Sequence, residues 1–520
     1  MKGKEPSWDL YSLAALALFC FFQAMQWPLL PKFLDIYYHL FVMKSFHEAG
    51  GYVMTSFWEY APIGRPHLYP PLLHLGMLGL YELGLKEIQI ARLVDCALYP
   101  SLLIVQWLVL RRLFNPRTAF FITVIFSSIY SLYLAAVTLA PFSLAYLIGL
   151  LALLSLHEKK IVLSGLCVGL CFYTHSWMAW IILLTILIYG SLSLEKRKDC
   201  VIASLVGLAA AAPLLFVQFL NREFFQFLKT KENLLLEIDP SVYLLALYGA
   251  VIARRKKGPY LLAVSLALAM LPLSLTHRFR FFSGHGLIGW TWLAGFAADE
   301  LYSRLGQGRK QKSAAIAWAL ISALYFYLVA PTFIWDLREE KNHLVFFNRS
   351  VNQYLGSEQD KNFRAKGFSI YFEKEYNQIV RLVREHTEKG DILWSNFNHG
   401  AGLVALLSDR ATSSAMLQEV KPFRPFDEIA AAKLLIWFKE PDGRPPKNME
   451  NVTQKHHSKL IAETDFVSIY ENPEGFSKNR PVAADVPTLP LFLIAVLIVG
   501  TAFLLSKTGF WRARLFDKAV

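Results

Sequence analysis

Apolar stretches long enough to cross a lipid bilayer dominate the pattern of the chain. They recur from the N-terminus to about residue 330, and one more lies near the C-terminus. Because a helix needs about 17 to 25 apolar residues to cross ~30 Å of hydrocarbon, the pattern predicts an α-helical polytopic membrane protein with about 12 transmembrane helices. The predicted spans are residues 10–30, 93–110, 118–136, 141–156, 161–174, 177–194, 200–220, 241–253, 259–275, 286–303, 313–331 and 487–506.

Basic residues gather between the predicted spans and indicate their orientation. Cytoplasmic loops carry an excess of Lys and Arg. An arrangement with both termini in the cytoplasm places every basic cluster there, provided that the apolar stretch Pro71–Leu85 does not cross the membrane. We therefore predict that this stretch is an interfacial or re-entrant helix. The clusters begin at Arg111, Lys159, Lys196, Arg254, Arg309 and Lys507.

Three polar segments are predicted to face the extracytoplasmic side, at residues 31–92, 221–240 and 331–486. The first is a long loop among short connections, and long loops often carry function. The third combines β-rich runs such as Leu434–Phe438 with helical patterns such as Tyr376–His386, which predicts a small α/β domain. The predicted domains are a transmembrane domain over 1–330 that includes the loop, the α/β domain over 331–486, and a final transmembrane helix with a cytoplasmic tail over 487–520.

Composition argues against two other classes of protein. The chain is 55% hydrophobic and 14% aromatic, which is too apolar for a single soluble globule. Its net charge of +13 lies in short clusters between apolar spans rather than on one soluble face, so nucleic acid is not an expected partner. The five cysteines all lie in or beside apolar spans, which argues against a disulfide framework.

The external loop 31–92 begins with a carboxylate at the predicted membrane boundary. A charge at this depth is costly unless it is paired, bound to metal or solvated in a cavity, so Asp35 is the first functional candidate. An interfacial carboxylate in water is the alternative. If the stretch is helical, the spacing of i to i+4 puts Asp35 and His39 on one face. Glu59 is a second acidic candidate in the same loop.

The other candidates on this side are guanidinium and imidazole groups. Arg65 and Arg92 of the loop suit phosphate oxygens. The cluster His277–Phe282 keeps positive charge outside, where it is disfavoured, and this suggests a bound anion such as a lipid phosphate. Headgroup snorkelling by its arginines is the alternative. For His175, at an external helix end, metal ligation and an interfacial hydrogen bond are comparable alternatives.

Taken together, these residues resemble the GT-C class of glycosyltransferases, polytopic enzymes that use polyprenyl-phosphate or polyprenyl-diphosphate sugars. Asp35 occupies the position of the acidic residue that follows the first helix in that class. The segment Gly64–Pro71 with Arg92 is similar to the juxtamembrane segment and luminal arginine of protein O-mannosyltransferases and their relatives. Within the class, the chain looks most like the catalytic subunit of oligosaccharyltransferase, including its archaeal form.

Two further segments carry the resemblance to that subunit. Leu234–Pro240 is similar to a mobile external loop with a catalytic glutamate shortly before a proline, and the resemblance gives that role to Glu237. The pair Arg278-Phe279 or Arg280-Phe281 looks like the Arg-Phe pair whose arginine contacts the donor phosphate.

Two segments depart from the pattern of oligosaccharyltransferase. Asp391–Gly400 is similar to the Trp-Trp-Asp-Tyr-Gly segment that reads the acceptor, but Asn396 stands at the aspartate position and Trp394 alone remains of the two tryptophans. The second external loop, Leu139–Ser143, has no carboxylate where the family has an acidic motif. A divalent metal, Mg or Mn, would therefore need other ligands, and the expected set is Asp35, His39, His175 and Glu237.

The residues and the resemblance together predict a membrane glycosyltransferase that acts on the extracytoplasmic face of a prokaryotic cell membrane or of the ER membrane. Its expected partners are a lipid-linked sugar donor, membrane lipid, and a glycan or protein acceptor. The alternatives are an oligosaccharyltransferase for protein N-glycosylation, a transporter or flippase of an anionic lipid, and a non-catalytic binding protein. The expected catalytic residues are Asp35, Glu237 and Glu59, and the expected phosphate contacts are Arg278, Arg280, Arg65, Arg92 and His277.

Overall fold

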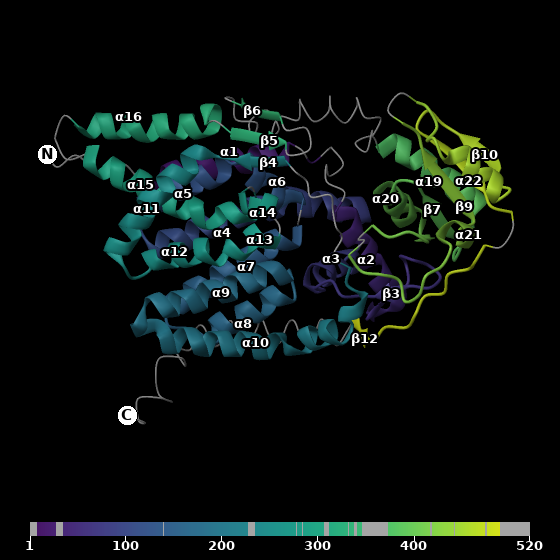
Figure 1. Ribbon diagram of the computed structural model, residues 1–520, viewed down its shortest axis with the longest axis horizontal. Helices are drawn as coiled ribbons and strands as arrows, with labels where there is room; N and C mark the ends of the chain where they lie inside the picture. The colour runs from purple at the N-terminus through teal and green to yellow at the C-terminus, as the bar shows by residue number, and fades with distance from the viewer. Residues whose placement is uncertain are drawn as a thin grey trace. The chain divides into compact units, whose positions relative to one another are not determined.

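In the computed structural model (Figure 1), contacts divide the chain into two compact units. Unit 1 comprises Met1–Ile36, Ala91–Leu214 and Phe227–Ala365. Unit 2 comprises Tyr37–Ile90, Leu215–Gln226 and Lys366–Val520. The residues that the structure describes are 8–25, 27, 35–138, 140–226, 235–276, 278–282, 284–305, 311–330, 332–336, 341–345, 373–416, 419–440, 443–473 and 476–488.

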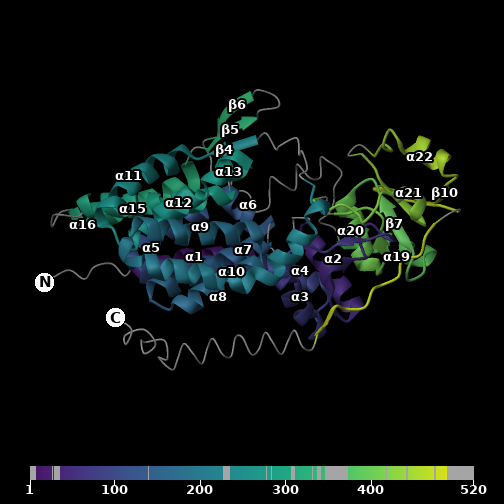
Figure 2. The ribbon, with the colours of Figure 1, turned by 60° about the horizontal axis from the view of Figure 1, so that its bottom comes forward.

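Unit 1 is a bundle of apolar helices (Figures 1 and 2). Local sequence sets where they begin. The side chain of Asn115 accepts a hydrogen bond from the backbone N–H of Thr118 (2.9 Å), and Pro116 occupies the first helical position. The helices are α1 (Trp8–Ala24), α4 (Glu87–Leu113), α5 (Pro116–Ser128), α6 (Tyr130–Thr138), α7 (Ala140–His157), α8 (Ile161–Phe172), α9 (Ser176–Leu192), α10 (Arg197–Leu220), α11 (Pro240–Lys256), α12 (Tyr260–Ala269), α13 (Leu271–Thr276), α14 (Arg278–Phe282), α15 (Leu287–Leu305) and α16 (Gln311–Leu324).

Three stretches in the described part of the chain are long and apolar enough to cross a membrane, namely Glu87–Leu113, Ala140–His157 and Leu194–Leu220. The predicted span 118–136 is not one straight helix, because α5 and the helical residues after Ile129 form a pair bent by 82°. The predicted span 259–275 breaks between α12 and α13. The shorter apolar helices are Trp8–Ala24, Ile161–Phe172, Ser176–Leu192, Tyr260–Leu275 and Ala317–Leu328. The predicted span 487–506 lies almost wholly outside the described residues.

Glycines let neighbouring helices of unit 1 pack closely. A Cβ atom on Gly165 of α8 would lie 2.6 Å from the Cβ of Val206 on α10, and one on Gly169 would lie 2.6 Å from the Cβ of Ala210. This is the close approach of small residues that membrane helices use. A small antiparallel sheet, visible in Figure 2, completes the unit with the order β4 (Leu235–Ile238), β5 (Thr332–Asp336) and β6 (Lys341–Val345).

Unit 2 contains the predicted α/β domain. Its five-stranded sheet has the order β10 (Lys459–Glu463), β11 (Val467–Glu471), β9 (Leu434–Phe438), β7 (Ile392–Ser395) and β8 (Ala411–Thr412). Strand β7 runs parallel to β8 and β9, and the remaining pairs are antiparallel. Helix α19 (Glu373–His386) packs on α20 (Asn398–Ser408), which packs on β7. The structure confirms the strands and the helix that the sequence predicts in this segment.

The predicted external loop folds largely with this domain. Its elements are α2 (Asp35–Ala49), β1 (Gly51–Tyr52), β2 (Thr55–Ser56), β3 (Arg65–Pro66) and α3 (Leu72–Glu82). Strand β1 pairs with β12 (Val486–Pro487), and Ala61 joins the core cluster around Trp437. The structure therefore groups residues 37–90 with the C-terminal part, whereas the sequence placed them in the transmembrane domain. The 11 residues of α3 span only about 16 Å, too short to cross a bilayer, as expected.

Candidate functional site

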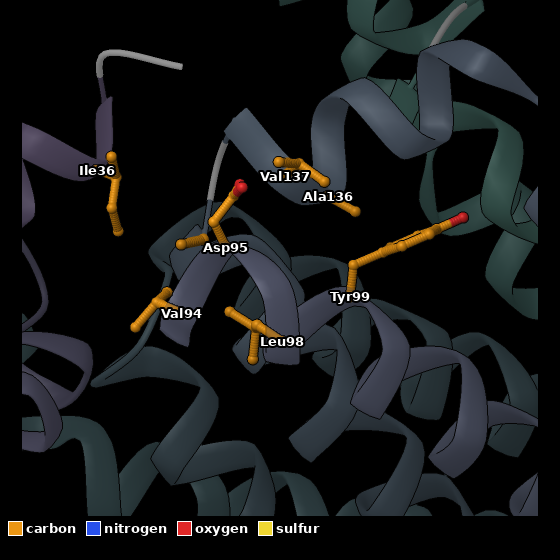
Figure 3. A pocket seen from close by; sticks show the side chains of 8 residues that line it. Ile36, Val94, Asp95, Leu98, Tyr99, Ala136 and Val137 are labelled. Atoms are coloured by element: carbon orange, nitrogen blue, oxygen red, sulfur yellow. The ribbon is translucent and has the colours of Figure 1, made fainter. Parts of the chain in front are cut away.

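A small cavity of about 10 Å³, room for about one water molecule, lies in unit 1 where three helical segments meet (Figure 3). Ile36 of α2 lines it, with the first turns of α4 and the stretch around the junction of α6 and α7. Asp35, the first functional candidate, is the half-buried residue just before Ile36. The lining residues from α4 include Val94, Asp95 and Tyr99, and those from the junction include Ala136 and Ala140.

Asp95 is a residue of this cavity that the sequence reasoning missed. It is the third residue of the predicted span 93–110. Figure 3 shows its carboxylate directed toward Ala136 and Val137 of α6. A charge inside an apolar span is itself a signal of a functional site, and that signal could have identified Asp95 from the sequence.

Buried polar groups fix the backbone around Asp95. The amide Nε2 of Gln23 on α1 donates a hydrogen bond to the backbone oxygen of Asp95 (2.9 Å). The oxygen Oε1 of the same amide accepts one from the hydroxyl of Tyr133 on α6 (3.3 Å). The ring of Tyr133 stands edge-on to that of Tyr99, with centroids 5.2 Å apart. These contacts join α1, α4 and α6 beside the cavity.

The break between α5 and α6 brings the end of α6 to the cavity. The Oγ of Ser143 on α7 donates a hydrogen bond to the backbone oxygen of Ala136 (2.6 Å), which satisfies a carbonyl at the end of α6. The backbone N–H of Gly284 donates to Ser131 Oγ (3.1 Å), where Gly284 has φ +64°, a conformation that favours glycine. Broken helices at membrane depth occur where they line a cavity or are buried in protein.

His175 caps a helix in unit 1. Its Nδ1 accepts a hydrogen bond from the backbone N–H of Met178 (3.2 Å), so its neutral form carries the proton on Nε2. The ring stacks parallel to His285 at 6.2 Å, and Phe142 stands edge-on to both. Capping uses the nitrogen lone pair that a metal would otherwise take.

The remaining candidates of unit 1 are described in part. Arg92 is half-buried in α4, three residues before Asp95, and Arg280 is half-buried in α14. The backbone of Glu237 lies in β4 opposite Ile334 of β5. Arg278 lies in α14, while the side chains of Glu237 and Arg278, and the whole of His277, lie outside the described residues.

In unit 2, Glu59 and Arg65 form a buried ion pair. Their side chains are 1% and 2% exposed. Glu59 also accepts a hydrogen bond from the backbone N–H of Met416 (2.7 Å), and Arg65 donates to the backbone oxygen of Val420 (3.4 Å). Burial lowers the pKa of Arg65, but the neighbouring Glu59 carboxylate outweighs this and raises it overall. The pair thus ties the loop to the segment after β8.

Three buried histidines lie beside this pair. His39 Nδ1 and His74 Nε2 are 2.9 Å apart and share a hydrogen bond, and the rings of His67 and His74 are 5.8 Å apart. Burial lowers the pKa of His67 to about 3, with the charge of Arg65 adding to the effect. Burial also holds the pKa of His74 well below its usual range. Both rings are therefore neutral at physiological pH.

The expected metal ligands are described only in part. Among the residues that the structure describes, no group of three or more His, Cys, Asp or Glu side chains lies close enough to hold a metal ion. Of the four expected ligands, His39 is bonded to His74, His175 caps a helix, and the side chain of Glu237 is not described.

Comparison with solved structures identifies the fold. No family model and no curated protein matches the chain. The oligosaccharyltransferase of Archaeoglobus fulgidus in the apo form is similar over 82% of this chain and 69% of that one, with 11% identity and a TM-score of 0.57. The apo form of ArnT from Cupriavidus metallidurans is similar over 88% of this chain and 98% of that one, with 14% identity and a TM-score of 0.53.

The chain has the GT-C fold. The expected resemblance is thereby confirmed at the level of the fold. A third similar structure is the archaeal oligosaccharyltransferase AglB from Archaeoglobus fulgidus in complex with an inhibitory peptide and a dolichol-phosphate, with 11% identity, a TM-score of 0.54 and the same coverage of 82% and 69%. The GT-C fold thus covers most of this chain, including parts of both units.

Proposed function

We propose that the chain is a membrane glycosyltransferase that transfers a sugar from a polyprenyl-phosphate-linked donor to an acceptor on the extracytoplasmic face. The observation that carries the proposal is the GT-C fold, which is shared with ArnT over 98% of that chain. Similar structures hold a dolichol-phosphate in one case and undecaprenyl phosphate in another, at TM-scores of 0.54 and 0.50. A polyprenyl-phosphate carrier is the ligand common to both.

The proposed place of transfer lies beside the small cavity of unit 1, which itself has room for about one water molecule. Asp35 takes the proton from the acceptor hydroxyl as the acceptor oxygen bonds to the anomeric carbon of the sugar. The bond from that carbon to the phosphate oxygen breaks, and the polyprenyl phosphate leaves with the electron pair. Arg92, Arg278 and Arg280 stabilise the negative charge of the departing phosphate. Glu237 is the proposed second acidic residue of the site.

Two residues from the sequence-based set take another role in this proposal. The charges of Glu59 and Arg65 neutralise each other inside unit 2, and each also bonds to the backbone there. Because this ion pair is deeply buried, we assign it a structural role in unit 2 and not a contact with the substrate. A divalent metal held by the expected set of Asp35, His39, His175 and Glu237 stays a prediction, because the side chain of Glu237 lies outside the described residues.

The test is a transfer assay with the full chain in proteoliposomes. The donors are undecaprenyl-phosphate glucose and dolichyl-phosphate mannose with a labelled sugar, and the acceptors are lipid-linked glycans and peptides. The expected result is release of the carrier phosphate with appearance of label on an acceptor. Movement of labelled lipid between leaflets without any sugar transfer would instead support the transporter alternative and contradict the proposal.

Transfer of a glycan to asparagine, as in an oligosaccharyltransferase, is the second candidate, because four of the similar structures carry that name. In the segment that resembles the acceptor-reading motif, Asn396 bonds through both side-chain groups to the backbone of Phe438, at 2.8 and 3.0 Å. Trp394 packs against Trp437 with ring centroids 5.0 Å apart. These contacts engage both residues within the domain, which ranks the second candidate below the first. A peptide with an Asn-X-Thr sequon tests it as acceptor.

A further inference from the structure

Asp95 gives the cavity of unit 1 its charge. It is the one charged residue among the eight that line the cavity, and Tyr99 is the one other polar residue among them. Its helix, α4, is apolar enough to cross a bilayer. A carboxylate inside such a helix is costly, and it persists where it faces a cavity or a partner and has a function.

Two independent features point to a ligand at this place. The first is the carboxylate, which is directed across the cavity toward Ala136 and Val137 (Figure 3). The second is the bend of 82° between α5 and the helical residues that contribute Ala136 and Val137. Because broken helices recur where transmembrane proteins bind substrates, the bend and the charge support the same interpretation.

The surroundings hold the carboxylate in a fixed position. The bond from Gln23 to the Asp95 backbone and the bond from Tyr133 to Gln23 connect three helices beside it. Gln23 is 1% exposed, so this connection is shielded from competing water. A binding group is effective when its supporting contacts are rigid in this way.

The sign of the charge indicates which part of a substrate meets Asp95. A carboxylate repels a phosphate group but accepts hydrogen bonds from hydroxyl groups. Arg92, of opposite sign, lies three residues earlier on α4, which is ~4.5 Å along the helix axis and on a neighbouring part of the same face. The two residues therefore give this end of α4 a cationic and an anionic position.

We propose that Asp95 accepts hydrogen bonds from hydroxyl groups of the sugar that is transferred, with the donor phosphate toward Arg92. This inference rests on the proposed function and deepens it, since it names the residue that distinguishes a sugar-bearing carrier from the bare carrier lipid. The junction of α6 and α7 contributes only apolar residues to the cavity, among them Val137 and Ala140. The one carboxylate of the lining is that of Asp95 on α4.

Binding measurements on the full chain in lipid nanodiscs test this assignment. The probes are undecaprenyl phosphate, undecaprenyl-phosphate glucose and dolichyl-phosphate mannose. The substitution Asp95→Asn should weaken binding of the better sugar-bearing probe about 10- to 100-fold, because hydrogen bonds to a charged group are lost, and should change binding of undecaprenyl phosphate less than about twofold. The matched control is Asp199→Asn, which changes a carboxylate in the first turn of α10.

A second measurement needs no variant. Donors in which single hydroxyl groups of the sugar are replaced by hydrogen are bound to the wild-type protein. At least one of them should bind about 10-fold more weakly than its parent, because Asp95 loses a hydrogen-bond donor. This series keeps the assignment testable even if Asp95→Asn does not fold.

Three results would overturn the assignment: equal weakening of the bare and the sugar-bearing probes by Asp95→Asn, binding of every probe unchanged by that substitution, or deoxy donors that all bind like their parent. A wild-type protein that binds no polyprenyl phosphate of any kind would instead contradict the proposed function itself.

Discussion

The start and the middle of the predicted external loop differ in the structure. At its start, Asp35 precedes Ile36, which lines a cavity in unit 1. In its middle, Glu59 and Arg65 are buried in unit 2 and neutralise each other. Charged residues of one loop therefore divide into a group beside a cavity and a group that holds a domain together. The contrast teaches that the partner of a charge, more than its place in a loop, decides its role.

The largest expected effect comes from breaking the buried pair in unit 2. The substitution Arg65→Met leaves the Glu59 carboxylate buried without its cation, and should lower the free energy of unfolding of unit 2 by about 3–5 kcal/mol. Hydrogen exchange of the amides of β7 and β9 in the full protein measures this. The control Arg381→Met, which removes a surface arginine paired with Glu385 at 3.6 Å, should cost less than about 1 kcal/mol.

A double substitution sharpens the same point. Glu59→Gln combined with Arg65→Met removes the uncompensated charge and keeps an acceptor for the Met416 N–H, so it should recover much of the lost stability. If Arg65→Met were as stable as the wild type but failed to bind donor, Arg65 would belong with the cavity residues and the contrast between the two groups would be lost.

Acid should destabilise unit 2 next most strongly. The folded-state pKa values of His67 and His74 are lowered, to about 3 for His67, so the unfolded chain binds more protons than the folded chain below the unperturbed value. Stability should then fall as the pH drops below about 6.5, by about 1.4 kcal/mol per pH unit for each histidine, until the folded-state pKa is reached.

Hydrogen exchange at pH 7.0 and pH 5.5 in the full protein would measure this slope. The substitution His67→Asn should reduce it, while His386→Asn, on the exposed end of α19, should leave it unchanged. An equal slope in the wild type and in His67→Asn would show that His67 does not enter the folded state as a neutral group.

A smaller effect is expected from Lys44, which joins elements of unit 2. Its Nζ contacts Glu87 at 2.7 Å, Asp409 at 2.9 Å and the hydroxyl of Tyr81 at 2.8 Å. Burial lowers the pKa of Lys44, but these hydrogen bonds outweigh it and keep the group charged. Lys44→Met should lower the unfolding free energy by about 1–3 kcal/mol.

Thermal unfolding of the purified protein measures the loss at Lys44. The exposed neighbour Lys86 provides the control substitution Lys86→Met, with an expected change within about 0.5 kcal/mol. Equal unfolding temperatures for Lys44→Met and Lys86→Met would show that Lys44 does not stabilise unit 2.

The smallest expected effect concerns Asn396. Asn396→Ala removes two hydrogen bonds to the backbone of Phe438 and should cost about 1 kcal/mol. Under the proposed function, the KM for the acceptor should not change. A large rise in that KM for a sequon peptide, at unchanged stability, would place Asn396 in acceptor recognition and favour the oligosaccharyltransferase alternative.

The sequence predicted the local elements well and the long-range pairing poorly. Strands such as Leu434–Phe438 follow from β-rich runs, and the non-crossing helix α3 follows from the placement of the basic clusters. The pairing of β1 with β12 joins residues more than 400 positions apart, and no local pattern encodes it. The bend after Ile129 is equally invisible to periodicity, because both sides of it are apolar.

The sequence identified only part of the candidate site. Asp35 stood out because it is a charge at the edge of a span. Asp95 was missed, although it is a charged residue near the start of the predicted span 93–110. The burial of Glu59 and Arg65 depends on Met416 and Val420, whose contacts exist only in the folded chain.

The most direct test of the central claim is the initial rate of sugar transfer by Asp35→Asn in proteoliposomes, measured beside the wild type and Asp199→Asn. With the protein folded and donor saturating, loss of the proton acceptor should reduce the rate about 10²- to 10⁴-fold, while the control keeps the wild-type rate. An Asp35→Asn protein that transfers sugar at the wild-type rate would contradict the assignment of the site of transfer beside the cavity in unit 1.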